Sequence, residues 1–255
     1  MAFYDLTKQQ RIKKVDLINS IICDELNADA YRKTYTYFSN PDTYIRKAAY
    51  ISVGRIYFER KEYQFKIIKI LTGCLKHKDF KVRQTAINAA GEIGKKNFKV
   101  VAHIFDAGLF DEHHSPRNAV IGSVKKMGQV NPVPVLSWAK RYLHHDDREI
   151  RREICHGIEL RGRTHPGDIL PLLKELQYDT TARVRTTLVH VIGQIAYKKG
   201  CLEIVVAELN RWENQLLVQE ALIEIVDVHH RYRTFAALTQ KQAAAYVARH
   251  SKIKI

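Results

Sequence analysis

A pattern that returns every 34 residues constrains this chain more than any other feature of its sequence. Each copy contains a polar, turn-forming cluster, then a marker residue that is usually arginine, then apolar residues three, four and seven positions later. After a first step of 37 residues, four steps are each 34, and the markers are Arg46, Arg83, Arg117, Arg151, Arg185 and Gln219. Self-similarity at a fixed period is typical of solenoids, in which each repeat buries its apolar face against its neighbours.

Each copy predicts two helices, because its apolar residues recur at helical spacing and no segment alternates with a period of two. Residues 7–26 predict an opening helix, and Thr239 with Gln242 predicts a capping box before a closing helix. We therefore expect an all-α fold, an α-α superhelix of about six helical pairs in a single domain. Its parts are an amino-terminal cap at 1–28, repeats at 30–230 and a carboxy-terminal cap at 231–255.

The balance of charge favours an anionic partner. The chain has 42 lysines and arginines against 27 acidic residues, a formal charge of +15. A field of that sign attracts nucleic acid or an acidic protein surface, although solubility alone is the alternative explanation.

Other features of the sequence favour a cytoplasmic protein. The first residues lack the apolar segment of a signal peptide, and no run is long enough to span a membrane, so no membrane partner is expected. Cys23, Cys74, Cys155 and Cys201 have no metal-ligand spacing, which favours buried, reduced thiols over disulfides. Three pairs of adjacent histidines also lack ligand spacing, so neither a metal nor another cofactor is expected.

The run from Asp79 to Arg83, of the form D-x-x-V-R, resembles the HEAT repeat, as do Asp42 with Arg46 and Asp147 with Arg151. This resemblance covers residues 30–230 and implies that the marker arginine is structural, pairing with turn acids and carbonyl groups. It implies little about function, because such arrays bind many kinds of partner.

Residues 133–212 resemble the bacterial HEAT-like DNA alkylation-repair glycosylases. The similar runs are VLSWAKRYLHHDDREIRREI, HPGDILPLL and ARVRTTLVHVIGQIAYKKG. The resemblance implies DNA binding, and Arg152 fits a DNA-contacting arginine of that family. The chain departs from it at the catalytic aspartate between tryptophans, where Arg117 or Asn118 stands, and His190 replaces an aromatic residue.

The second helix of each pair has another face, opposite the core, that is rich in cations and hydrogen-bond donors. In a right-handed solenoid this face lines the concave surface, so it predicts a basic groove for a phosphate backbone. Glycines eight positions after the marker would let a ligand approach closely, unless they serve helix packing. The residues predicted to bind nucleic acid are Lys47, Arg55, Asn88, Lys95, Lys126, Arg152, His156, Arg163, His190, Gln194 and Lys198.

Three functions stay open. The first is binding of DNA or another nucleic acid without glycosylase chemistry. The second is an active alkylpurine glycosylase in which Glu159 or Asp111 replaces the missing aspartate; the alternative for Glu159 is an ordinary stripe of ion pairs along one helix with Arg152, His156 and Arg163. The third is a scaffold for an acidic protein, with the tyrosines of YRKTYTYF as anchors. The sequence does not predict the oligomeric state.

Overall fold

The computed structural model describes residues 3–255. These residues form helices and turns and no strand, which confirms the all-α prediction. By contacts the chain divides into two compact units, Met1–Asn131 (unit 1) and Pro132–Ile255 (unit 2). The expected single array of repeats stays a prediction.

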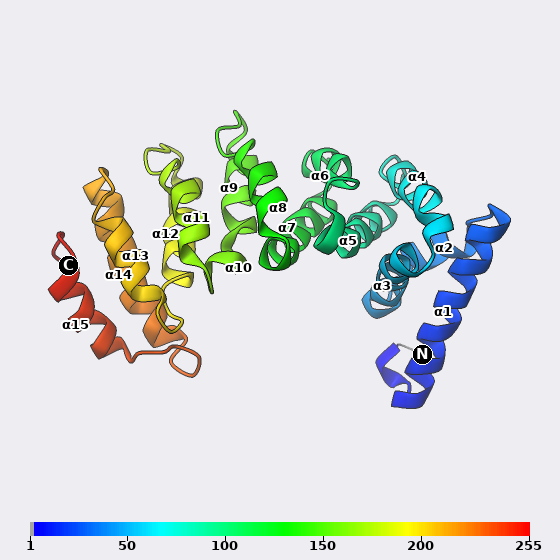
Figure 1. Cartoon of the computed structure of the whole chain (residues 1–255), viewed down its shortest axis with the longest axis horizontal. Coiled ribbons are helices and arrows are strands. Elements are labelled where there is room, and N and C mark those ends of the chain that lie inside the picture. The colour runs from blue at the N-terminus through cyan, green and yellow to red at the C-terminus, as the bar shows by residue number, and fades with distance from the viewer. Residues whose placement is uncertain (1–2) are drawn as a thin grey trace. The chain divides into compact units, whose positions relative to one another are not determined.

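Unit 1 consists of an opening helix followed by three helical pairs (Figure 1). Its helices are α1 (Lys8–Ala28), α2 (Arg32–Phe38), α3 (Thr43–Glu59), α4 (Gln64–Cys74), α5 (Phe80–Asn97), α6 (Ala102–Leu109) and α7 (His114–Val130), with short 3-10 turns at Phe3–Asp5 and Lys61–Tyr63.

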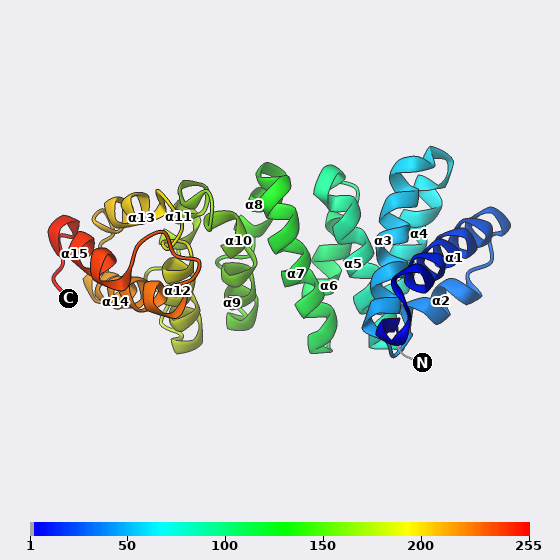
Figure 2. The same ribbon diagram turned by 90° about the horizontal axis from the view of Figure 1, so that it is seen from below.

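Unit 2 continues the pattern of pairs and ends in a closing helix. Its helices are α8 (Pro132–Lys140), α9 (Arg148–Gly157), α10 (Glu159–Gly162), α11 (Pro166–Lys174), α12 (Ala182–Gln194), α13 (Cys201–Leu209), α14 (Gln215–Arg231) and α15 (Gln240–His250). Figure 2 shows two layers in this unit, with α8, α11 and α13 in one and α9, α12 and α14 in the other.

The second helix of each pair stacks on the second helix of the next within each unit. In unit 1, α3 packs on α5 and α5 on α7; in unit 2, α9 packs on α12 and α12 on α14. We call these the second helices, and count the short α10 with them because it continues α9 after Ile158.

Local sequence signals fix where these helices begin. The side chains of Asp42, Asp79 and Asp147 accept hydrogen bonds from the backbone N–H two residues later, and His113 does so in the third copy. The predicted capping box of Thr239 and Gln242 is present. Such caps satisfy N–H groups that the first helical turn leaves without partners.

The core follows the repeat closely. Ala86, Ile87 and Ala90, which follow Arg83 by three, four and seven residues, are fully buried. The pattern is wrong in the last copy, where Ile223 is 53% exposed. Ile87 occupies the same position in its own copy and is covered by Gly108 on α6, the first helix of the next pair. No further helical pair follows α14 in the described chain, so Ile223 lacks such a cover.

Glycines eight positions after the marker serve helix packing, so the idea that they admit a ligand is wrong. A Cβ atom on Gly54 would lie 2.5 Å from Cβ of Glu92 on α5. A Cβ on Gly91 would lie 2.5 Å from Oγ of Ser123, and one on Gly193 would lie 2.6 Å from Cγ of Glu224. Each glycine therefore lets two second helices approach closely.

Two further observations concern predictions made from composition. Cys74, Cys155 and Cys201 are buried, as expected, and Cys23 is partly exposed. Among residues 3–255, none of the helices has the length and apolar character needed to cross a bilayer.

Candidate functional site

The marker arginines hold turns together. Arg83 donates from Nη1 to the carbonyl oxygens of His77 (2.8 Å) and Lys78 (3.2 Å), and from Nε to Asp111 (2.7 Å). Arg151 repeats this arrangement with Asp179 of the following copy. The hydrogen bond from Arg83 to Asp111 is the main cause that raises the pKa of this guanidinium. The partner acid is thus the one in the next turn, while the acid of the same turn caps its own helix.

Asp111, one of the two candidate catalytic carboxylates, belongs to this turn network. Its side chain is 8% exposed, and both oxygens accept hydrogen bonds from Arg83. One of them also accepts from the backbone N–H of His113. A carboxylate held in this way positions a turn, and its geometry gives no support to a catalytic role.

The second helices of unit 1 are strongly basic. Together α3, α5 and α7 carry ten lysines and arginines and two acidic residues. Of the predicted binding residues, Lys47, Arg55 and Lys126 are exposed and Asn88 is half-buried. This face therefore has several cations whose charge is open to a ligand.

Two other cations of this face already have partners. Lys95 donates to Glu92 at 2.5 Å, three residues earlier on α5. Lys96 lies 5.1 Å from the centre of the Phe58 ring, so it makes a cation–π contact between α5 and α3. Lys95 is consequently a weaker candidate for ligand binding than Lys47, Arg55 or Lys126.

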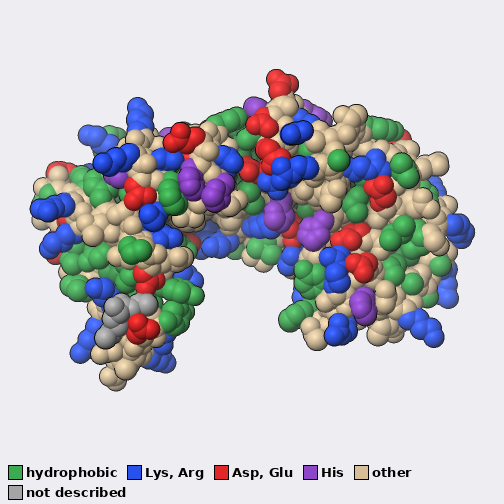
Figure 3. Space-filling view, turned by 180° about the vertical axis from the view of Figure 1, so that it is seen from behind, with side chains coloured by type: hydrophobic (Ala, Val, Ile, Leu, Met, Phe, Trp, Pro, Cys, Tyr) green, Lys and Arg blue, Asp and Glu red, His purple; other side chains and the backbone are tan. Residues whose placement is uncertain are grey.

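The second helices of unit 2 have balanced charge. α9, α10, α12 and α14 carry seven lysines and arginines and six acidic residues. Figure 3 shows acidic, basic and histidine side chains interspersed on this face. Arg152, for example, lies 2.9 Å from Glu149 and 3.6 Å from Glu153, so the arginine that resembled a DNA contact is paired within its own helix.

A charged cluster forms around Glu159, the other candidate catalytic carboxylate. Its side chain is 2% exposed and contacts Arg163 (2.8 Å from Nε) and His156 (3.1 Å from Nε2). Arg163 also donates to Oε1 of the buried Gln194, at 2.9 Å. The structure therefore brings together four residues that the sequence placed on one groove.

The helix beneath this cluster differs from the prediction. We expected one continuous helix, but the backbone departs from it at Ile158, between α9 and α10. Gly157 and Gly162 lie in this stretch, and glycine is the poorest helix former apart from proline. The predicted contacts at three and four residues form nonetheless.

The Glu159 carboxylate is poorly arranged to act on a sugar. A carboxylate that assists glycosidic cleavage must face the reacting atoms, whereas this one is buried and engaged by Arg163 and His156. Nε2 of Gln194 is buried without a hydrogen-bond partner. The cluster is best explained as an ion-pair network that joins α9, α10 and α12.

His190 and Lys198 have separate surroundings. His190 Nδ1 lies 3.4 Å from Glu224, which also pairs with Arg231. Lys198 lies 5.0 Å from the centre of the Tyr197 ring and 5.9 Å from that of Phe235. No group of three or more potential metal ligands occurs in the described part of the chain.

Glu224, the acidic partner of His190, was not among the predicted site residues, although the sequence contains a signal for it. Glu224 stands 34 residues after His190, which itself stands 34 after His156. Extending the column by one copy would have placed a carboxylate beside His190. The surroundings of Lys198 had no such signal, because Phe235 lies beyond the last repeat.

Comparisons with known proteins do not identify a family. No family model matches the chain, and no curated protein matches it. A solved structure with detectable similarity is that of an engineered protein, 16% identical, covering 77% of this chain and 96% of its own, with a TM-score of 0.35. That likeness carries no argument, so the resemblance to HEAT repeats and to repair glycosylases stays a prediction.

Proposed function

We propose that this protein binds the phosphate backbone of nucleic acid through the second helices of unit 1. The observation that carries the proposal is that Lys47, Arg55 and Lys126 are exposed on second helices that together carry ten basic and two acidic residues. Unit 1 as a whole contains 23 of the 42 lysines and arginines and 13 of the 27 acidic residues. Exposed cations bind a phosphate backbone by releasing condensed counterions, which requires no base-specific contact.

The geometry favours this surface over the others that the sequence suggested. Lys47 and Arg55 are exposed on α3 and Lys126 is exposed on α7, and both helices pack on α5. In unit 2, by contrast, Arg152, His156, Arg163 and His190 have acidic partners. An anion there would have to displace a carboxylate, so unit 2 adds little to binding of this kind.

The test is a salt titration of binding to fluorescently labelled duplex DNA, followed by fluorescence anisotropy between about 50 and 200 mM salt. The variant replaces Lys47, Arg55 and Lys126 together by glutamine. If each makes one phosphate contact, the slope of log K against log salt becomes shallower by about 2.7. A labelled single strand and a labelled RNA duplex, measured in parallel, identify the preferred nucleic acid.

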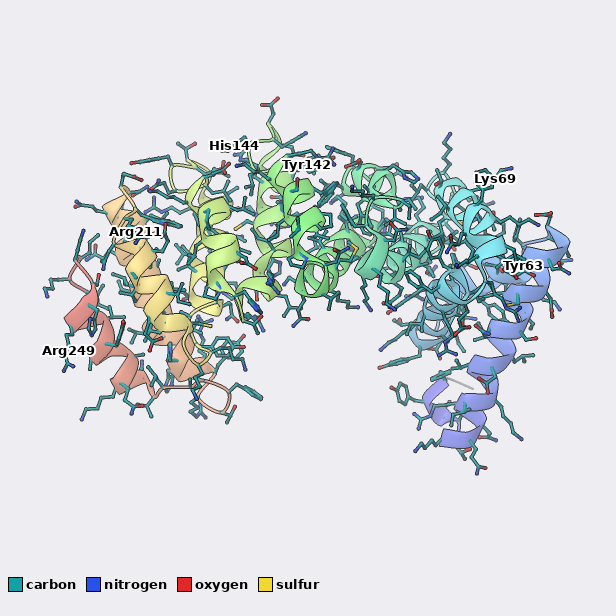
Figure 4. The ribbon with its side chains drawn as sticks, in the orientation of Figure 1. Tyr63, Lys69, Tyr142, His144, Arg211 and Arg249 are labelled. Carbon is teal, nitrogen blue, oxygen red and sulfur yellow. The ribbon has the colours of Figure 1, made fainter. Side chains whose placement is uncertain are left out.

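A charge-matched control replaces Lys69, Lys76 and Lys99 by glutamine. All three are exposed and lie outside the second helices, and Figure 4 labels Lys69 on α4. The control retains the slope of the original protein. Equal losses in the two triple variants, or no binding by the original protein at low salt, would refute the proposal.

A further inference from the structure

Unit 2 contains a cavity of about 530 Å³ where α12, α13 and the segment after α14 meet. Its wall includes Tyr197, Lys198, Lys199, Gly200, His229 and Phe235. None of these belongs to the second helices of unit 1, and Arg163 of the Glu159 network lies 5.9 Å from the centre of the Tyr197 ring.

Two contacts hold the segment around the end of α14 beside this cavity. The N–H of Ala237 donates to the carbonyl oxygen of Tyr197 at 2.9 Å. The rings of Tyr197 and Tyr232 stack with their centres 5.3 Å apart. Figure 2 shows the segment that joins α14 to α15, in orange, passing close to the end of α12. The cavity is therefore part of the folded unit.

The amino terminus of α13 opens onto this cavity without a side-chain cap. Gly200 precedes the helix with φ +76°, a left-handed conformation that favours glycine. Because glycine has no side chain, it provides no group that could cap the helix. Cys201 N–H bonds to the carbonyl oxygen of Lys198, while Leu202 and Glu203 also line the cavity. Uncapped N–H groups at a helix start, together with the helix dipole, attract an anion.

His229 is a second, independent sign of a ligand. It is 1% exposed and lines the cavity, and its Nδ1 lies 2.8 Å from the carbonyl oxygen of Ile225. A carbonyl oxygen only accepts hydrogen bonds, so Nδ1 carries the proton. Nε2 is left without a partner among the residues that the structure describes, although the ring is almost completely buried.

The remaining walls suit a small organic phosphate. Lys198 holds its ammonium group beside the Tyr197 and Phe235 rings, and Lys199 is exposed next to it. Phe235 is 67% exposed, which leaves its ring open to a flat organic group. The carboxylate of Glu203 also borders the cavity, and because it is exposed it can turn away from a bound anion.

We propose that this cavity binds the phosphate group of a small phosphorylated organic molecule. The phosphate is held by the start of α13 and by Lys198 and Lys199, and His229 Nε2 accepts a hydrogen bond from a protonated phosphate oxygen. The organic part lies against Phe235. This site is separate from the nucleic-acid surface proposed for unit 1, and either can fail without the other.

Isothermal titration calorimetry with inorganic phosphate, adenosine 5′-monophosphate and adenosine tests the proposal. We expect saturable binding of both phosphate compounds, tighter for the nucleotide, and none of adenosine. Lys199→Gln weakens binding, whereas Glu203→Gln tightens it by roughly two- to fivefold, the effect of one charge near a helix start. Both side chains are exposed, so neither change threatens folding.

Two controls make the outcome decisive. Arg249→Gln removes a cation from α15, where Figure 4 labels it, and leaves the affinity unchanged. The triple variant of Lys47, Arg55 and Lys126 also retains phosphate binding, which separates the two proposals. The inference is overturned if no saturable binding is seen into the millimolar range, or if the nucleotide and adenosine bind with equal affinity. It is also overturned if neither Lys199→Gln nor Glu203→Gln changes the affinity.

Discussion

Gly54 and Gly122 provide a direct test of how the second helices stack. Both are helical glycines of unit 1, on α3 and α7. A Cβ on Gly54 would lie 2.5 Å from Cβ of Glu92 and 3.7 Å from its Cα, so α3 or α5 must shift to admit it. A Cβ on Gly122 would meet nothing within 4 Å.

The two alanine variants therefore differ in one energetic contribution. Replacing glycine by alanine inside a helix stabilises it by about 1 kcal/mol, and both variants gain this. Only Gly54→Ala also incurs the cost of overpacking, about 1–3 kcal/mol. We expect Gly122→Ala to be more stable than the original protein, and Gly54→Ala to be less stable than Gly122→Ala by the full overpacking cost.

Urea unfolding followed by far-ultraviolet circular dichroism measures the difference. With a dependence on urea of about 1–3 kcal/mol per molar, the midpoints of the two variants should separate by roughly 1 M. Gly73→Ala on α4, where a Cβ also meets nothing within 4 Å, serves as a second unobstructed control. If Gly54→Ala stabilises as much as the two controls, the close approach of α3 and α5 is not as described.

Two further predictions concern the turns and the thiols. Arg83→Gln leaves the Asp111 carboxylate buried without its charged partner and costs about 3–5 kcal/mol. Arg185→Gln, at a partly exposed pair with Glu220, costs about 1 kcal/mol or less. Similar urea midpoints for the two variants would contradict the role of Arg83 in joining successive turns. Ellman's reagent should label Cys23 first, while Cys74 and Cys155 react only on unfolding, because burial raises the pKa of Cys74 to about 12 and raises that of Cys155 as well. Cys23→Ser removes the fast labelling phase, and its persistence in that variant would show that a buried thiol is accessible.

The repeat pattern predicted the parts of the fold that recur for the same physical reason in each copy. Ala86, Ile87 and Ala90 are buried because a neighbouring helix covers the same face in each interior copy. Ile223 has the same place in the pattern but lacks that cover, so periodicity alone overstated its burial. The marker arginines were predicted as structural, and the acidic partners of Arg83 and Arg151 lie in the following turn.

The candidate site was less predictable, because a cation's availability depends on side chains from other copies. Arg163 reaches Gln194, 31 residues further on, and His190 reaches Glu224 one repeat later. Counting charges along single helices does not reveal such pairs. The cavity beside α13 was beyond prediction for another reason, since Phe235 and Ala237 lie outside the periodic part of the sequence.

The second helices of unit 1 and those of unit 2 differ in charge, and this difference indicates where an anionic partner binds. In unit 2 the charges neutralise one another within the layer, and several are partly buried, so the layer requires no external anion. In unit 1, Arg83 and Lys95 pair with acids, whereas the like charges of the exposed Lys47, Arg55 and Lys126 repel one another. Stacking explains the buried faces of the second helices in both units equally well, but it does not explain why exposed cations gather on those of unit 1. Because that repulsion is relieved by condensed anions or by a polyanion, unit 1 is where binding should be sought first.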